Sequence, residues 1–367
     1  MDDALLVHYR LTPAPGENAA DKARGIALEQ TAELPARCIP ETLLETHVGQ
    51  LVDLQQTDDN TWNASIAYAP ELCGGEATQL LNLLFGNISM KAGILITGID
   101  WPPALLEHFG GPGHGITGLR SLLQLPPHQP LSCTALKPMG SDASALAAMT
   151  RAFAAGGVDI IKDDHGLANQ PSARFGDRLH ACQQAVEQVN ARHGGRSLYF
   201  PNVTAGPSEL LERLAMARDA GCRGVLLSPW LCGLDSLRLA RDDFGLAVIA
   251  HPAMTGSYFG SEHGLQPEVL LGDLFRVAGA DAVIYPNTGG RFGFSLATCE
   301  AINDALRRPL GGLHAAMPAP GGGMDMARAA HWIDQYGVDT MVLIGGSLYE
   351  RGDLRSATRE LLATLGR

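Results

Sequence analysis

Four ionisable side chains follow one another at the end of a short, mostly apolar segment. Residues 158–161 precede the run Lys162-Asp163-Asp164-His165. Burying such groups unpaired is costly, so they must face one another, water, a ligand or a metal ion. In a barrel of parallel strands, the active site lies at the carboxyl ends of the strands. A salt-bridged strand end at the surface is the simpler interpretation, but this mixture of acids, lysine and imidazole favours a functional site.

Two more polar side chains end predicted strands. Lys137 follows the segment 131–136, and a lysine in such a place suits an acid, a base or an anion anchor. With Lys162 and two carboxylates nearby, one lysine of this cluster can have a lowered pKa and become reactive. His251 ends the segment 246–251. A histidine there is about as often a packed residue as a functional one.

Two glycine-rich turns follow the last two predicted strands. They contain Gly321-Gly322-Gly323 and Gly345-Gly346. Exposed backbone N–H groups and helix N-termini attract anions, and the turns after strands seven and eight of a barrel commonly hold a phosphate. The two turns together predict a phosphate site. Asn202 and Thr204, after the third strand, are either ligands or parts of a structural turn.

Eight short apolar segments, from about residue 120 onward, alternate with amphipathic segments that are rich in Ala, Leu and Arg. This α/β pattern predicts a (β/α)8 TIM barrel over residues 121–367. Residues 1–120 contain shorter mixed segments and predict a separate α+β domain of the ferredoxin-like type. A doubly wound open sheet is the alternative, but no dinucleotide fingerprint follows the first strand. The predicted strands are 131–137, 158–162, 198–203, 224–231, 246–251, 282–285, 312–317 and 340–344.

Composition narrows the class of partner. The chain of 367 residues has a net charge of −12, which disfavours nucleic acid and anionic membranes as partners. No apolar run is long enough to span a bilayer, and the acidic start does not resemble a signal peptide. The 7 cysteines are scattered without a CxxC pair, so disulfides are not expected. These features predict a cytoplasmic protein.

The motifs occur in an order that resembles the large subunit of ribulose-bisphosphate carboxylase (RuBisCO), and most closely its non-carboxylating, RuBisCO-like relatives. The resemblance covers nearly the whole chain. Its most specific part is Gly-Gly-x-Asp-x-x-Lys-x-Asp followed by Asn-Gln-Pro. The matching segments are 85–87, 111–115, 137–138, 156–164, 169–171, 202–206, 251–254 and the two glycine turns.

The resemblance implies roles for the residues of the barrel. Lys162 would take up CO₂ as a carbamate and bind Mg²⁺, with Asp164 as the second ligand and His165 in the position of the third. Lys137 would be the general acid or base beside the enediolate carbon. His251 would contact the substrate hydroxyls.

The resemblance also implies a phosphate site and a partner subunit. Gly322, Gly345 and Gly346 would hold one phosphate of a phosphorylated small-molecule substrate. Asn87, and with it Glu29, would reach into the site of a second subunit. The expected assembly is therefore a head-to-tail homodimer with two shared active sites.

Departures from the carboxylases argue against ribulose-bisphosphate carboxylation. His165 stands where carboxylases have Glu, which removes a negative charge and changes the metal preference. Pro252 replaces the arginine of the second phosphate site. The loop 287–292 lacks the lysine that holds CO₂, and Arg291 is its only cation. A substrate with a single phosphate is expected.

Two reactions on such a substrate are compatible with the resemblance. One is enolisation or isomerisation of a 5-methylthioribulose-1-phosphate-type substrate. The other converts 3-oxoisoapionate 4-phosphate, as a transcarboxylase and hydrolase, to 3-phosphoglycerate and glycolate. His165, the short C-terminal region and the segment 251–254 favour the second. A methylthio group needs an apolar slot, whereas a carboxylate needs a cation such as Arg291.

A non-catalytic RuBisCO-like protein with a vestigial site is the third possibility. The loss of several ligand-type residues supports it. The joint presence of Lys137, Lys162, Asp164 and His251, each at a strand end, argues against it.

Overall fold

A five-stranded mixed sheet forms the core of the amino-terminal part of the chain. The computed structural model describes residues 3–367, and in it the strand order is β10-β4-β1-β3-β2. Strands β4, β1, β3 and β2 are antiparallel neighbours, and the element order β1-α1-β2-β3-α3-β4 is that of a ferredoxin-like domain. β1 buries every second residue, as a strand with one face on a core does. The ferredoxin-like prediction is confirmed.

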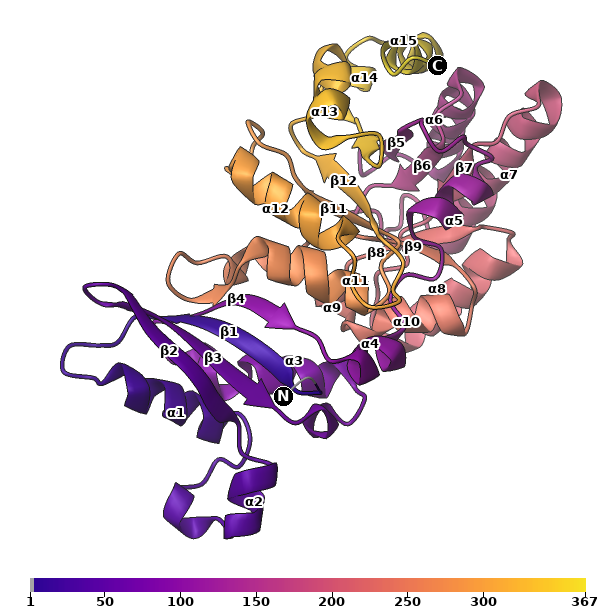
Figure 1. The fold of residues 1–367 in the computed structure, drawn as a ribbon. Coiled ribbons are helices and arrows are strands. Elements are labelled where there is room, and N and C mark those ends of the chain that lie inside the picture. The colour runs from indigo at the N-terminus through magenta and orange to yellow at the C-terminus, as the bar shows by residue number, and fades with distance from the viewer. Residues whose placement is uncertain (1–2) are drawn as a thin grey trace.

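The elements of this part precede the barrel in the chain, and most of them lie at the lower left of Figure 1. The strands are β1 (Leu5–Leu11), β2 (Gln50–Asp58), β3 (Thr61–Tyr68) and β4 (Ile94–Asp100). The helices are α1 (Ala19–Glu29), α2 (Glu41–Thr46), α3 (Ala77–Phe85), α4 (Pro103–Phe109) and α5 (Gly115–Leu122). The fifth strand, β10 (Gly264–Leu265), comes from the barrel part and pairs with β4 in parallel. This pairing ties the two parts of the chain together.

Eight parallel strands form the barrel, in two four-stranded sheets of order β13-β5-β6-β7 and β12-β11-β9-β8. A parallel bridge between Asn202 and Leu226 joins the sheets at one seam, and β12 lies beside β13 at the other. The TIM-barrel prediction is therefore confirmed. The strands are β5 (Leu131–Leu136), β6 (Ile160–Asp163), β7 (Leu198–Phe200), β8 (Gly224–Leu227), β9 (Ala247–Ala250), β11 (Ala282–Pro286), β12 (Met317–Gly321) and β13 (Met341–Leu343).

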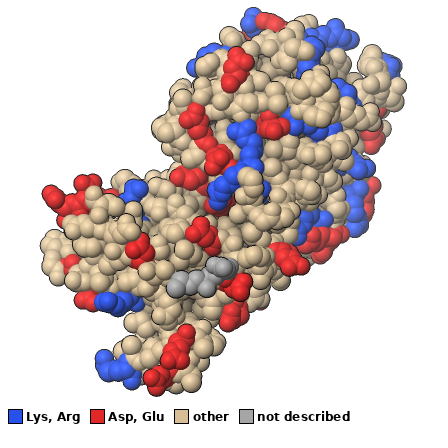
Figure 2. Space-filling view, in the orientation of Figure 1, with Lys and Arg blue, Asp and Glu red and all other residues tan. Residues whose placement is uncertain are grey.

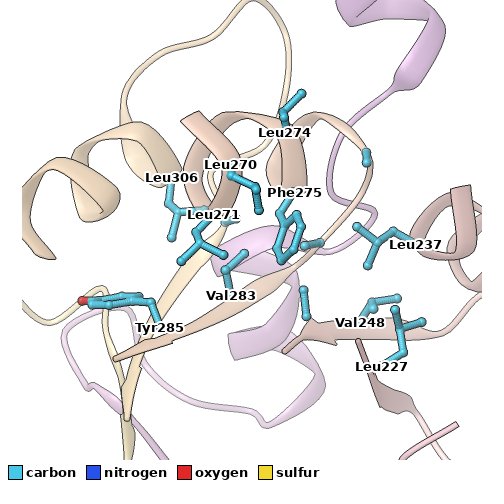
Figure 3. Close-up of a cluster of buried hydrophobic side chains, with 14 of the residues drawn as sticks. Leu227, Leu237, Val248, Leu270, Leu271, Leu274, Phe275, Val283, Tyr285 and Leu306 are labelled. Carbon is cyan, nitrogen blue, oxygen red and sulfur yellow. The ribbon is translucent and has the colours of Figure 1, made fainter. Parts of the chain in front are cut away.

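Helices enclose the strands and supply the outer layer of the core (Figure 1). Figure 3 shows one section, where Leu270, Leu271 and Phe275 lie against Val248 and Val283 of the sheet. The helices are α6 (Ala143–Gly156), α7 (Phe175–His193), α8 (Pro207–Asp219), α9 (Pro229–Cys232), α10 (Asp235–Asp242), the π-helix η5 (Glu268–Leu274), α11 (Phe275–Val277), α12 (Leu296–Arg307), α13 (Ala329–Tyr336), α14 (Gly346–Tyr349) and α15 (Leu354–Thr364).

The seventh barrel strand was predicted too early in the chain. The segment 312–317 was expected, but β12 runs over Met317–Gly321. Its Met-Pro-Ala-Pro-Gly sequence contains two residues that cannot donate to a ladder, which argues against a strand. They are tolerated because β12 is the end strand of its hydrogen-bonded sheet. The next α-helix, α13, begins at Ala329.

α5 belongs to the barrel by its contacts. Its residues Ile116 and Leu119 share a buried cluster with Leu131 and Ile160 of the strands. A domain boundary at residue 120, within α5, stays a prediction.

No helix within residues 3–367 has both the length and the apolar character needed to cross a bilayer. Figure 2 shows acidic and basic side chains in scattered groups on a face that is mostly uncharged.

Candidate active site

Strand geometry separates the two adjacent aspartates at the end of β6. Successive side chains of a strand point to opposite sides. Asp163 points outward, toward α7, where its carboxylate meets Arg178. Lys162 and Asp164 therefore share the inner side, at the carboxyl end of the barrel. The predicted cluster divides into an outer structural residue and an inner functional pair.

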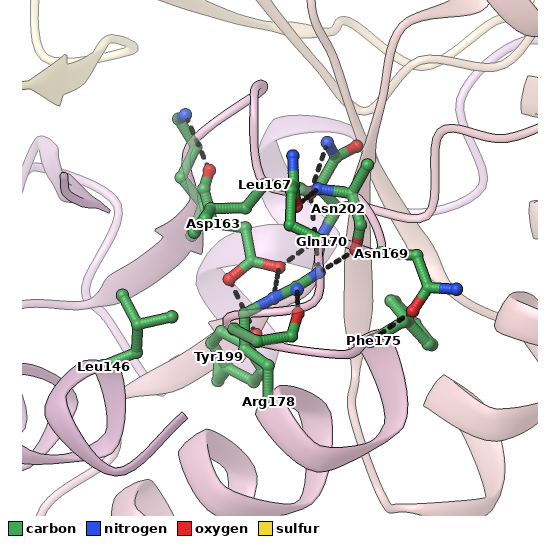
Figure 4. Close-up of polar contacts among 12 residues, drawn as sticks. Leu146, Asp163, Leu167, Asn169, Gln170, Phe175, Arg178, Tyr199 and Asn202 are labelled. Atoms are coloured by element: carbon green, nitrogen blue, oxygen red, sulfur yellow. Dashed lines mark hydrogen bonds and ion pairs between the residues drawn. The ribbon is translucent and has the colours of Figure 1, made fainter. Parts of the chain in front are cut away.

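Asp163 is the centre of a fully buried network (Figure 4). Its carboxylate accepts hydrogen bonds from Arg178 Nε at 2.9 Å, from the Tyr199 hydroxyl at 2.8 Å and from the backbone N–H of Asn202 at 2.9 Å. Both side chains of the Asp163–Arg178 pair have an exposed fraction of 0%. The network fixes the end of β6 relative to β7 and α7. No local sequence pattern identifies Arg178 or Tyr199, because their contacts with Asp163 join residues that are distant in the chain.

Asn202 extends this network toward the site. Its side-chain amide donates to the backbone oxygens of His165, at 2.9 Å, and Leu167, at 3.0 Å. Its own oxygen accepts from the Thr204 hydroxyl at 2.7 Å. Of the two interpretations left open for Asn202 and Thr204, the contacts favour a structural turn. That turn holds the loop that carries His165.

Lys162 is a buried lysine with few partners. Its side chain is 3% exposed, and its Nζ donates to the backbone oxygen of Asp163 at 3.1 Å. Burial lowers the pKa of Lys162, and the charges of Cys133 and Asp164 only partly oppose this effect. A lysine with a lowered pKa has a larger fraction of neutral amine, which is the form that reacts with CO₂.

Lys137 and Asp164 meet across the neighbouring strands β5 and β6. Lys137 Nζ lies 2.7 Å from Asp164 Oδ1. Burial acts to raise the pKa of Asp164, but the contacts with His165 and Lys137 outweigh it and keep the pKa well below its usual range. Asp164 is therefore a carboxylate at neutral pH, next to two lysines.

His165 and His251 form a stacked pair at the same site. Their ring centroids are 4.2 Å apart and the ring planes differ by 11°. Nδ1 of His165 also lies 3.6 Å from Asp164 Oδ1. Burial, followed by the charges of Lys162 and His165, lowers the pKa of His251 well below its usual value. His251 is thus a neutral imidazole at neutral pH.

The turn at Gly345 and Gly346 lies close to this cluster. A Cβ atom at Gly345 would be 3.8 Å from Cε of Lys137. Gly346 begins α14, whose Tyr349 accepts a hydrogen bond from the Lys137 backbone N–H at 2.9 Å. Tyr349 also donates to the backbone oxygen of Ala135 at 2.9 Å, so it fixes the last residues of β5. Sequence reasoning missed this tyrosine, which has no motif around it.

Arg291 and Gly322 occupy neighbouring loops. The backbone N–H of Arg291 donates to the Gly322 oxygen at 3.2 Å, and Gly322 has a φ of +70° beneath the Phe292 ring. The Arg291 guanidinium lies over that same ring, 5.4 Å from its centroid. The loop after β11 therefore packs directly on the glycine turn after β12.

Asn87 and Glu29 lie together on the amino-terminal domain. The Asn87 amide donates to Glu29 Oε1 at 3.1 Å, and Lys91 Nζ lies 3.1 Å from Glu29 Oε2. Among residues 3–367, the hydrogen bonds of these side chains do not reach the lysines and histidines of the barrel. A single chain therefore does not join the two groups.

The residues of the barrel mouth fit a divalent ion only if Lys162 is modified. Within residues 3–367, no three His, Cys, Asp and Glu side chains are grouped as metal ligands. An ammonium cannot bind a cation, whereas a carbamate on the neutral Lys162 amine would add an oxygen ligand beside Asp164. Mg²⁺ prefers such hard oxygen ligands. The buried, poorly paired lysine next to an ionised carboxylate is compatible with this chemistry.

Comparisons with known proteins agree with the fold. Residues 115–357 match the family described as ribulose bisphosphate carboxylase large chain, catalytic domain. The 5-methylthioribulose-1-phosphate isomerase of Rhodospirillum rubrum is 39% identical over 355 residues, which cover 96% of this chain and 93% of the relative.

Solved structures point to the same family. The RuBisCO-like protein from Rhodopseudomonas palustris superposes with a TM-score of 0.89 at 34% identity, covering 100% of this chain and 98% of that one. The dimeric archaeal RuBisCO from Hyperthermus butylicus gives a TM-score of 0.91 at 25% identity, over 100% and 90% of the two chains. The chain belongs to the ribulose-bisphosphate carboxylase large-chain family. Within that family it is a RuBisCO-like protein, as its motifs predicted.

Proposed function

We propose that this chain is an enzyme that converts a mono-phosphorylated ketose through an enediolate, as an isomerase or enolase of 5-methylthioribulose-1-phosphate-type substrates. The observation that carries the proposal is the convergence of Lys137, Lys162, Asp164 and His251 at one end of the barrel, beside the Gly345 turn. A vestigial site would have no reason to keep a buried, poorly paired lysine next to an ionised carboxylate.

Each residue has a distinct task in this proposal. Lys162, after addition of CO₂ to its neutral amine with loss of a proton, and Asp164 would hold Mg²⁺. When bound, Mg²⁺ stabilises negative charge on substrate oxygens. Lys137 moves the proton at the reacting carbon, and His251 donates a hydrogen bond to a substrate hydroxyl. The backbone N–H groups of the glycine turns bind the phosphate.

The segment after β9 supports a substrate with one phosphate and an apolar end. It reads Pro252-Ala253-Met254, without a cation, and Met254 is 64% exposed. An exposed thioether side chain three residues after His251 suits a methylthio group better than a second phosphate. The similarity to the Rhodospirillum rubrum isomerase points to the same substrate class.

The transcarboxylase and hydrolase reaction on 3-oxoisoapionate 4-phosphate is the second candidate. It needs a cation for the substrate carboxylate. Arg291 is exposed and lies in the loop that packs on Gly322. Replacing Arg291 with Ala should abolish turnover of the oxo-acid but leave turnover of a methylthio substrate within about threefold.

Assembly completes the proposal. We infer a homodimer in which Asn87 and Glu29 of one subunit reach the barrel mouth of the other, because one chain alone does not bring these residues to Lys162. The similar RuBisCO of Hyperthermus butylicus is dimeric. A cytoplasmic location stays a prediction.

The proposal is tested by incubating the protein with 5-methylthioribulose 1-phosphate, Mg²⁺ and bicarbonate in D₂O. We expect deuterium to enter the substrate carbon with the wild-type protein and not with Lys162→Ala. Exchange that continues at the wild-type rate in Lys162→Ala would refute the carbamate role. Absence of exchange with every phosphorylated ketose and oxo-acid tested would favour the non-catalytic alternative.

A further inference from the structure

The stacked rings of His165 and His251 come from strands that are not neighbours. β7 and β8 stand between β6, which leads to His165, and β9, which leads to His251. The two imidazoles nevertheless lie face to face, with centroids 4.2 Å apart and planes at 11°. Such a contact restricts the rotation of both rings.

Each of the two residues is also held by a hydrogen bond. The backbone N–H of Ala253 donates to Nδ1 of His251 at 3.2 Å. Because Nδ1 accepts, the proton of the neutral ring lies on Nε2. On the other side, the Asn202 amide holds the backbone oxygen of His165 at 2.9 Å. Stacking fixes the plane of His251, and the Ala253 contact fixes its tautomer.

Ligand chemistry argues against a metal-binding role for His165. Mg²⁺ prefers hard oxygen ligands, and a neutral imidazole is a softer nitrogen ligand. The His165 ring packs face to face on His251. The position that carries a metal-binding Glu in carboxylases therefore has a different neighbour in this chain.

We propose that His165 is a positioning residue for His251: its stacked ring holds that imidazole so that Nε2–H points to a substrate oxygen. This inference rests on the proposed function, since it assumes that His251 contacts the substrate. The His165 side chain is 50% exposed, so replacing it should leave the fold intact. The flat ring makes the stacking contact with His251, whereas Nδ1 of His165 faces Asp164.

Two variants distinguish a positioning role of His165 from a metal-binding role. His165→Phe keeps a flat ring but removes both nitrogens, whereas His165→Ala removes the ring. Imidazole nitrogen chemical shifts of ¹⁵N-labelled protein report the tautomer of His251, and a His251→Gln spectrum identifies its signals. Calorimetric titration with Mg²⁺ in bicarbonate buffer measures metal binding without substrate. Steady-state kinetics with 5-methylthioribulose 1-phosphate provide the third measurement.

We expect His165→Phe to retain the Nε2–H tautomer and Mg²⁺ binding, with a kcat closer to that of the wild type than the kcat of His165→Ala. His165→Ala should show averaged nitrogen signals and a kcat lower by about tenfold to a hundredfold, the range expected for a misplaced catalytic group, with Mg²⁺ binding unchanged. Equal loss of Mg²⁺ binding in both variants would overturn the proposal, and so would an unchanged His251 tautomer in His165→Ala.

The role of His165 can be tested even if the proposed function is wrong. If no phosphorylated ketose is turned over, the nitrogen shifts and the Mg²⁺ titration still show whether His165 positions His251 or binds the metal. If turnover occurs but His165→Ala matches the wild type in all three measurements, the positioning role is wrong and the proposed function stands.

Discussion

Asp163 and Asp164 show how one step along a strand changes what a carboxylate does. The first is buried against Arg178 with an exposed fraction of 0%, and the second faces Lys137 at the barrel mouth. From the sequence, the two were members of one mixed-charge cluster. Their assignment to opposite sides follows from the alternation of side chains along β6. The contacts of Asp163 with Arg178 and Tyr199, which are distant in the chain, show which side is the outer one.

A matched pair of substitutions follows from this contrast. Asp163→Asn should lower the free energy of unfolding by about 3–5 kcal/mol, because it leaves the buried Arg178 charge uncompensated. Asp164→Asn should change it by less than about 1 kcal/mol, since its ion pair with Lys137 is partly exposed, but should abolish Mg²⁺ binding. Urea unfolding and Mg²⁺ titration of both variants check this. Equal stabilities of the two variants would contradict the assignment.

The stacking of His165 on His251 could not be predicted from the sequence, whereas the other residues of the site could. Lys137, Lys162, Asp164 and His251 were each recognisable as residues at strand ends. The stacking of His165 on His251 depends on the curvature of the barrel, which brings the ends of β6 and β9 together although β7 and β8 stand between them. Neither the spacing nor the types of these residues in the sequence indicate that the two rings lie 4.2 Å apart.

At the scale of elements, alternation of apolar and amphipathic segments was sufficient for seven of the eight barrel strands. The exception, β12, has proline at two of its five positions, so its sequence looked like a turn. The preceding segment, 312–317, was predicted as the strand instead, and it shares only Met317 with β12. The ferredoxin-like order could be predicted only as a class, because β10 joins that sheet from far along the chain.

η5 (Glu268–Leu274) contains a buried acid whose titration should be measurable. Asp273 lies against Arg308 at 2.8 Å, with 5% of its side chain exposed. Burial raises the pKa of Asp273 to about 6, although Arg308 opposes the effect. Since this pKa is above that of the unfolded chain, the folded state binds more protons between about pH 4 and pH 6. The contribution of Asp273 to stability therefore falls as the pH rises through this range.

Asp273→Asn should remove this dependence. The difference in unfolding free energy between wild type and variant should shift by about 2 kcal/mol in favour of the variant from pH 4.5 to pH 7.5. Urea unfolding at both pH values measures it, with the exposed Asp243→Asn as the control. A constant difference between wild type and Asp273→Asn would show that the pKa of Asp273 is not raised.

At the scale of the whole molecule, the two groups of candidate residues lie on different domains. Asn87 pairs with Glu29 on the amino-terminal domain, and Lys162 lies at the mouth of the barrel. Cyclic dimers bury the same surfaces on both subunits, so one pair of contacts makes two sites. Nothing in the sequence of one chain states this arrangement, and only the family resemblance suggested it.

Subunit mixing tests the shared site. Asn87→Ala and Lys162→Ala should each be nearly inactive alone. If the subunits are exchanged by mild denaturation and refolding, half of the dimers carry both variants, and each of these has one intact site of two. The mixture should recover up to about a quarter of wild-type activity. Lack of recovery, with dimers confirmed by light scattering, would show that each site belongs to one chain.

Magnesium binding with and without CO₂ tests the central claim most directly, because it needs no knowledge of the substrate. Calorimetric titration of the wild-type protein should show one Mg²⁺ site per chain in bicarbonate buffer and much weaker binding in CO₂-free buffer. Lys162→Ala should show the weak binding in both buffers. Tight, CO₂-independent binding to both proteins, or none to either, would contradict a metal site built on Lys162 and Asp164.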